Sequence, residues 1–234
     1  MIPALIGVSV VTSIFGCWPE ARDTLRGTVK PVVMSWVVWA AILCLSGAAA
    51  LSAGQLAAGV FTSAQGAECV VVAVLAARIP AADRDEPFRV PAGRYRVRLD
   101  MLCLPGAVTG LVLLAVLRDP AAAVTAAVAT DALAYVPTVA HGWTDPEHEA
   151  WRSYAWYWVS AVAALAAARH LTMTAIGHPA FLVLAEAVTT AVILGRRRAL
   201  ATTRLRRIGR EPPRIGPGPS RADAAPTPSS DTAK

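Results

Sequence analysis

Two glutamates, Glu68 and Glu186, stand inside long apolar runs of the sequence, where an ionised side chain is expensive. Each lies ten residues before an arginine, Arg78 or Arg196, that closes its run. In helices, which rise about 1.5 Å per residue, each carboxylate would sit roughly 15 Å from that arginine, near the middle of a bilayer. A carboxylate at that depth must face a cavity, pair with a cation or hold a proton. Neither run contains a Lys or Arg, so we predict a proton-coupled binding site; protonated glutamates with a structural role are the alternative.

The same runs and their neighbours supply the other candidates for this site. The predicted neighbours of the two glutamates are Gln65, Asp131, Thr189, Thr190 and Trp156. Asp131 equally suits a structural role at a helix interface. The aromatic residues after position 150 suit anchors at the bilayer surface, with Trp156 or Trp158 lining the site as the alternative.

The sequence indicates neither catalysis nor metal binding. The four histidines fall in or near predicted loops without HxxxH or HExxH spacing: His141, His148, His170 and His178. The four cysteines form no CxxC pair, so we interpret them as small buried hydrophobes. No GxSxG, P-loop or strand-borne GxGxxG motif is present. We therefore expect no enzyme activity, no catalytic residue, no metal and no cofactor.

The elements that must position the glutamates are membrane helices. The chain is 55% hydrophobic and only 16% charged, with a mean hydropathy of +0.48, whereas about a quarter of a soluble domain is charged. The net charge of +6 comes from arginines that flank apolar runs. The positive-inside rule explains such arginines, so nucleic acid is not an expected partner.

The apolar runs predict seven spans. Proline closes or kinks the first and fifth of them, at Pro19 and Pro137. The predicted spans are Ile2–Trp18, Val32–Leu51, Leu56–Ala77, Asp100–Leu117, Ala121–Val136, Trp151–Ala168 and Pro179–Gly195.

A constant offset of 118 residues relates the two halves of the chain. It pairs Pro19 with Pro137 and Glu68 with Glu186, and also Ser35 with Ser153, Thr12 with Thr130 and Arg78 with Arg196. Aromatics follow in step, Trp36 and Trp39 in one half and Tyr154 and Tyr157 in the other. We predict an all-α membrane protein with two parallel three-helix repeats and a linker helix, arranged 3+1+3. Its parts are a first bundle at 1–78, a polar loop at 79–99, a linker span at 100–119, a second bundle at 120–196 and a tail at 197–234.

The distribution of charged residues predicts on which side of the membrane each end of the chain lies. The loops after the first and third spans and the tail are basic, which predicts an N-terminus outside and a C-terminus in the cytoplasm of a multi-pass plasma-membrane protein. The tail begins with an arginine cluster that suits anionic lipid, continues as a surface helix over 199–208, and then becomes rich in Pro, Ser, Ala and Gly, as disordered segments are. Homo-oligomerisation is left open.

This pattern resembles the SWEET and PQ-loop families of seven-span membrane proteins. The resemblance covers residues 2–196 and is carried by Pro19 and Pro137, by the steps Ser35-Trp36 and Ser153-Tyr154, and by the predicted orientation. It implies alternating access, with the prolines as bending points and the solute held between two bundles. The glutamine of the PQ motif is replaced by Glu20 and Thr138, and the chain has no asparagine for a sugar pocket. The departures favour an amino acid or cation over a sugar.

The expected function is therefore transport of a small polar solute, a sugar, amino acid or cation, with the bilayer as the other partner. A membrane receptor or scaffold with a basic lipid- or partner-binding tail is the alternative. A light-sensing protein is excluded, because it needs a lysine in the seventh span and the lysines here are Lys30 and Lys234.

Overall fold

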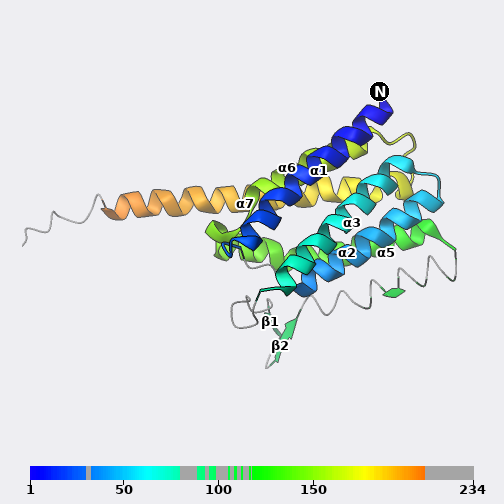
Figure 1. Cartoon of the computed structure of the whole chain (residues 1–234). Helices are drawn as coiled ribbons and strands as arrows, with labels where there is room; N and C mark the ends of the chain where they lie inside the picture. The colour runs from blue at the N-terminus through cyan, green and yellow to red at the C-terminus, as the bar shows by residue number, and fades with distance from the viewer. Residues whose placement is uncertain are drawn as a thin grey trace, which may run out of the picture. The chain divides into compact units, whose positions relative to one another are not determined.

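The computed structural model describes residues 1–29, 33–79, 89–92, 95–98 and 118–208, with isolated positions between 105 and 116. Six helices of at least 16 residues and one antiparallel hairpin make up most of this part of the chain (Figure 1). In chain order the elements are α1 (Ile2–Leu25), α2 (Val33–Ser52), α3 (Leu56–Ala77), β1 (Arg89–Ala92), β2 (Tyr95–Arg98), α5 (Pro120–Thr144), the 3₁₀ turn η2 (Pro146–His148), α6 (Trp151–Ala166) and α7 (Met173–Ile208).

The prediction of a helical fold is confirmed. Within the described residues, four helices are long and apolar enough to cross a membrane: Ile2–Leu25, Leu56–Ala77, Pro120–Thr144 and Met173–Thr203. A shorter apolar helix covers Trp36–Ser52. The hairpin within 89–98, in the predicted polar loop, was not expected, although residues 95–98 alternate between apolar and charged types as a strand does.

Several predictions fall on residues outside this description. They concern most of the linker span at 100–119, much of the polar loop, the side chain of Ser35 and the tail from 209 onward. Residues 1–197 form one compact unit, and residues from 198 onward belong to a second, of which the helical part ends at Ile208. The predicted helical continuation over 199–208 is thus confirmed.

Within the compact unit, contacts join α6, α1, α3, α2 and α5 in a continuous series. α3 lies between α1 and α2 and contacts both. α1 also packs along α6, and α2 packs along α5, as Figure 1 shows. Glycines allow the closest approach: a Cβ added to Gly47 on α2 would stand 2.9 Å from the backbone nitrogen of Ser63 on α3. Close packing through small residues is typical of helices in membranes.

Of the two alternatives predicted for Pro19, that it closes the first span or kinks it, the first is wrong, because α1 continues through Pro19 to Leu25. A proline removes one backbone donor, and a helix packed against neighbours can tolerate that loss. The stop signal is Gly27, whose φ of +69° few other residues adopt. The Gly27 N–H donates to the Thr24 carbonyl, and the Thr28 N–H donates to the Asp23 carbonyl, which caps the last turn.

Two later boundaries also differ from the prediction. α5 continues through position 137 to Thr144, so the backbone of Pro137 is helical as well. α7 begins at Met173, six residues before Pro179, which therefore lies inside the helix. The expected span ends at Trp18 and Val136 and the expected start at Pro179 are therefore wrong, whereas bending at Pro19 and Pro137 stays a prediction. At the start of α5, Asp119 accepts a hydrogen bond from the Ala122 N–H at 3.0 Å, a side-chain cap.

Candidate functional site

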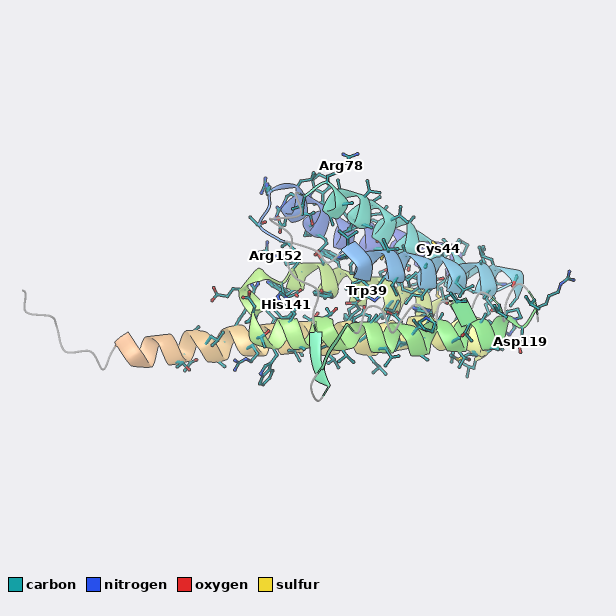
Figure 2. The ribbon with its side chains drawn as sticks, turned by 90° about the horizontal axis from the view of Figure 1, so that it is seen from below. Trp39, Cys44, Arg78, Asp119, His141 and Arg152 are labelled. Carbon is teal, nitrogen blue, oxygen red and sulfur yellow. The ribbon has the colours of Figure 1, made fainter. Side chains whose placement is uncertain are left out.

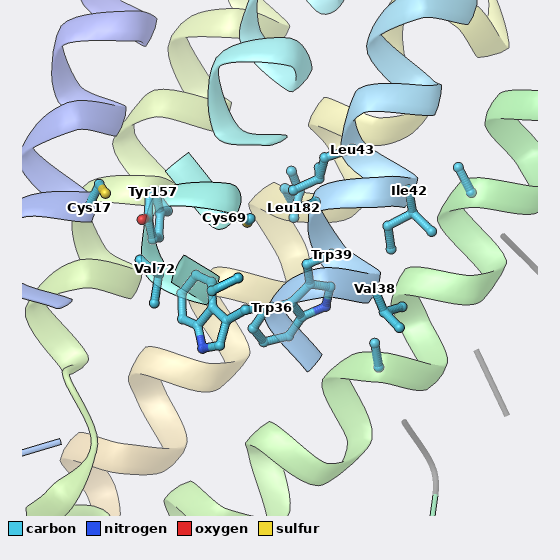
Figure 3. Packing of buried hydrophobic residues seen from close by; sticks show 14 of the residues in the cluster. Cys17, Trp36, Val38, Trp39, Ile42, Leu43, Cys69, Val72, Tyr157 and Leu182 are labelled. Atoms are coloured by element: carbon cyan, nitrogen blue, oxygen red, sulfur yellow. The ribbon is translucent and has the colours of Figure 1, made fainter. Parts of the chain in front are cut away.

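A buried cavity lies between five helices of the compact unit. The space open to the centre of a water-sized atom is about 40 Å³, enough for water or a small polar group. Figure 3 shows several of its walls, with Trp36, Trp39 and Leu43 on α2 near Cys69 and Leu182. The lining residues are Trp36, Trp39, Leu43, Gln65, Cys69, Asp131, Tyr135, Tyr154, Tyr157, Leu182 and Glu186.

Aromatic rings form much of the wall. Trp36 and Trp39 meet edge to face with centroids 5.3 Å apart, and Trp39 lies 5.6 Å from Tyr135. Tyr154 and Tyr157 enter from α6. Residues three apart share one face of a helix, which is why each of these pairs reaches the cavity together. The matching aromatic residues of the two halves of the sequence therefore line the same cavity.

Glu186 is the carboxylate at the centre of this wall. It is 3% exposed, and its Oε1 accepts a hydrogen bond of 2.6 Å from the Tyr135 hydroxyl on α5. Its other oxygen, Oε2, has no hydrogen-bond partner among the described residues. A buried acceptor without a partner costs free energy and is a binding site for a donor or a cation.

Asp131 contributes a second carboxylate, from α5. It is 1% exposed, and its Oδ2 lies 2.9 Å from Nε2 of His178 on α7. The other imidazole nitrogen, Nδ1, lies 2.9 Å from the Ser46 hydroxyl on α2. Oδ1 of Asp131 has no partner in the described part of the chain, and neither has Oε1 of Gln65. Three acceptor oxygens without partners therefore belong to residues that line one cavity.

A second polar cluster lies near the end of α5. The Tyr154 hydroxyl, which also reaches the cavity, donates to Oε2 of Glu149 at 3.1 Å. Oε1 of Glu149 pairs with Nδ1 of His141. Arg197 donates to the backbone carbonyls of Pro146 and Glu149. Figure 2 shows His141 and Asp119 toward opposite ends of α5, so Tyr154 connects the cavity with the His141 end.

Three of the predicted site residues come together in this cavity: Gln65, Asp131 and Glu186. Glu68 does not line it but accepts a 2.7 Å hydrogen bond from Ser13, so its surroundings differ from those of Glu186. The Thr189 hydroxyl bonds to the Ala185 carbonyl of its own helix, and the Thr190 hydroxyl is buried away from the lining. Trp156 is 41% exposed and packs on Phe15 instead.

His178 is the most important residue that the sequence interpretation missed. It was assigned to a loop because Pro179 follows it, yet it is 1% exposed inside α7. Tyr135 was also missed, because a tyrosine in an apolar run is indistinguishable from a residue at the bilayer surface. Tyr154 and Tyr157 could have been found: they are the 118-residue counterparts of Trp36 and Trp39.

The geometry defines a cavity between apolar helices, with mainly apolar, aromatic walls and a few polar groups. No Lys or Arg occurs among the residues that line it, so the described lining favours a proton or a cation over an anion. No protein-family model, no curated protein sequence and no solved structure matches this chain. Function is therefore inferred from the cavity and the helices that enclose it.

Proposed function

We propose that this chain is a multi-span membrane carrier of a small polar solute, which binds in the cavity between α2, α3, α5, α6 and α7. The observation that carries the proposal is the cavity itself. It places the partnerless carboxylate oxygens of Asp131 and Glu186 among aromatic rings, inside a bundle of apolar helices. Ligand sites with mainly apolar walls and a few convergent polar groups have this character, and intramembrane carboxylates commonly mark solute or proton pathways.

The exposed surface supports a membrane location. Large apolar side chains face outward along whole helices, which a protein in water would bury or avoid. On α1 they are Val8, Val11, Ile14, Phe15 and Trp18, and on α3 they are Val70, Val71 and Val74. With a span in the linker region, the six long helices would give seven crossings. The arginine distribution supports an N-terminus outside and a C-terminus in the cytoplasm.

The arrangement of helices supports two related halves. Shifted by 118 residues, α1 covers 120–143 and α2 covers 151–170, close to α5 and α6. α3 shifted in the same way covers 174–195, within α7. If each helix is replaced by its counterpart, α1 by α5 and α6 by α2, the contact between α1 and α6 becomes the contact between α5 and α2. Both contacts are present. Two parallel bundles around an axis along the membrane normal would produce this pattern.

Alternating access follows from this arrangement as the proposed mechanism. The solute would bind where α2, α3, α5, α6 and α7 converge, and rocking of one bundle against the other would open the cavity to one side and then the other. Pro19 in α1 and Pro137 in α5 occupy matching positions, where a missing backbone hydrogen bond makes a helix easier to bend. The prolines act as bending points, and Asp131, Gln65 and Glu186 as the binding groups.

The test is flux into proteoliposomes. Purified protein is assayed with a panel of sugars, amino acids and small cations, with and without a pH gradient. Glu186→Gln is compared with Glu68→Gln, a matched control because both glutamates lie at equivalent positions but only Glu186 lines the cavity. We expect Glu186→Gln to lose most of the flux and Glu68→Gln to retain it. Absence of flux for the whole panel, with folded protein, would favour the receptor or scaffold instead.

A further inference from the structure

His178 is a buried imidazole that joins three helices. It contacts Ser46 of α2 through Nδ1 and Asp131 of α5 through Nε2, each at 2.9 Å. A protonated imidazole donates from both nitrogens, to the Ser46 oxygen and to the Asp131 carboxylate. After loss of the Nδ1 proton, the Ser46 hydroxyl rotates and donates to that nitrogen instead. The same heavy-atom arrangement therefore accommodates both protonation states of His178.

Asp131 contacts His178 and also lines the cavity. Its Oδ2 holds the imidazole, whereas Oδ1 makes no hydrogen bond within 3.5 Å among the described residues, although the Trp39 indole N–H, which also has none, lies near this carboxylate. Glu186 Oε2 and Gln65 Oε1 have none in that part of the chain either, and both residues line the same cavity as Asp131. A cation that binds these oxygens therefore acts on the carboxylate that also holds His178.

The surroundings of the pair contain negative but no fixed positive charge. The titratable groups that face it are Glu186 of α7, Tyr135 of α5 and Cys69 of α3. From α2 the neighbours are the uncharged Ser46 and Trp39. No Lys or Arg is found among the residues that line the cavity. Among the described residues, the Asp131–His178 pair can be made neutral by one proton held between its two partners or by a bound cation.

We infer that Asp131 and His178 form a proton-binding site, and that a small cation in the cavity replaces its proton. This inference rests on the proposed carrier function and gives that carrier a substrate class and a mode, exchange of a cation against a proton. The protonated pair has no net charge. When the proton leaves His178, one negative charge remains, and a cation at Asp131 Oδ1 restores neutrality.

Two physical effects make the proton and the cation alternatives. An uncompensated charge in a buried site is costly, so the site is occupied by one or the other. Simultaneous occupancy would place the cation on Asp131 Oδ1 close to the imidazolium on Oδ2, where the two positive charges repel each other. The rings of Trp36, Trp39, Tyr154 and Tyr157 attract a cation through their faces, which favours an organic or weakly hydrated cation over a neutral solute.

The first test measures protonation of His178 directly. Full-length protein with ¹⁵N-labelled histidine is placed in lipid nanodiscs and titrated by NMR, and His178→Gln identifies the His178 signals among those of four histidines. We expect the His178 signals to change between the protonated and the neutral imidazole as the pH is varied. In Asp131→Asn, which loses the negative partner of the imidazolium, we expect the signals of protonated His178 to be lost. A His178 that stays in one protonation state throughout would overturn the inference.

The second test measures exchange in the same wild-type sample, so that it does not depend on a variant that folds poorly. The probes are guanidinium, sodium and potassium chlorides, with choline chloride as the control for ionic strength. Guanidinium stays charged throughout and has N–H donors for the three oxygens. We expect at least guanidinium to lower the pH at which His178 is protonated, by about one pH unit for each tenfold excess over its dissociation constant, and to release about one proton per bound cation. A midpoint that none of the three salts shifts would overturn the exchange.

These measurements separate the inference from the carrier function. Proton and cation binding in nanodiscs requires no transport, so exchange without flux would retain the site and remove the carrier. Flux of a neutral solute that ignores both the pH gradient and His178→Gln would retain the carrier and overturn the proton–cation exchange.

Discussion

At the scale of single residues, two glutamates of the chain have different surroundings, and only one of them lines the cavity. Glu68 and Glu186 look equivalent in the sequence, with the same spacing to a closing arginine. In the structure Glu68 bonds to Ser13, whereas Glu186 bonds to Tyr135 and lines the cavity. The difference arises from neighbouring helices, because Cys17 stands in the first half where the second has Tyr135. The spacing of residues along one helix does not show which side chains a neighbouring helix places against them.

The tryptophans give a test at this scale. Trp39 is 9% exposed and packs in the core beside Tyr135, whereas Trp156 is 41% exposed. We expect Trp39→Ala to lower the free energy of unfolding by about 3–5 kcal/mol, because a large buried ring leaves a void. Trp156→Ala should cost about 1 kcal/mol or less, as surface changes do. Thermal unfolding in detergent measures both, and equal losses would contradict the assignment of Trp39 to the cavity wall.

At the scale of the helices, the sequence predicted where most of them lie but not all of their ends. The expected start of the third helix at Leu56 and its end at Ala77 match α3, and the sixth helix was expected to begin at Trp151, where α6 begins. The sequence interpretation gave too much weight to Pro19, Pro137 and Pro179 as helix boundaries. Packing within a helical bundle offsets the loss of the backbone hydrogen bond that proline removes. The misplaced start of α7 is what hid His178.

The contact between α2 and α3 supports a second prediction. A Cβ at Gly47 would meet the Ser63 backbone, which cannot move without displacing α3. We expect Gly47→Ala to destabilise the protein by about 1–3 kcal/mol through overpacking. The matched control is Gly7→Ala on α1, where nothing lies within 4 Å of the added carbon. That change should be neutral or stabilising, because alanine favours a helix.

Thermal unfolding of the two glycine variants in the same detergent provides the comparison. A Gly47→Ala protein as stable as the Gly7→Ala protein would mean that α2 and α3 are further apart than described here.

At the scale of the whole molecule, the sequence predicted a helical bundle with polar residues inside it. Three predicted residues, Gln65, Asp131 and Glu186, do line one cavity. The rest of the site could be found only from the packing, since Tyr135 lines the cavity from α5, and His178 on α7 contacts Asp131 and Ser46 rather than the cavity itself. The proposed carrier needs this cavity to be reached from both sides of the membrane, which a receptor or scaffold does not.

Thiol accessibility is the most direct test of that claim. Leu182, which lines the cavity, is replaced by Cys in a variant whose native cysteines are replaced by Ala, and a membrane-impermeant cationic thiol reagent is added to either side of oriented proteoliposomes. Leu184→Cys is the control, because Leu184 is 68% exposed on the apolar surface. We predict modification of Cys at 182 from both sides and none at 184. Modification at 182 from one side only, or from neither, would contradict a carrier that works by alternating access.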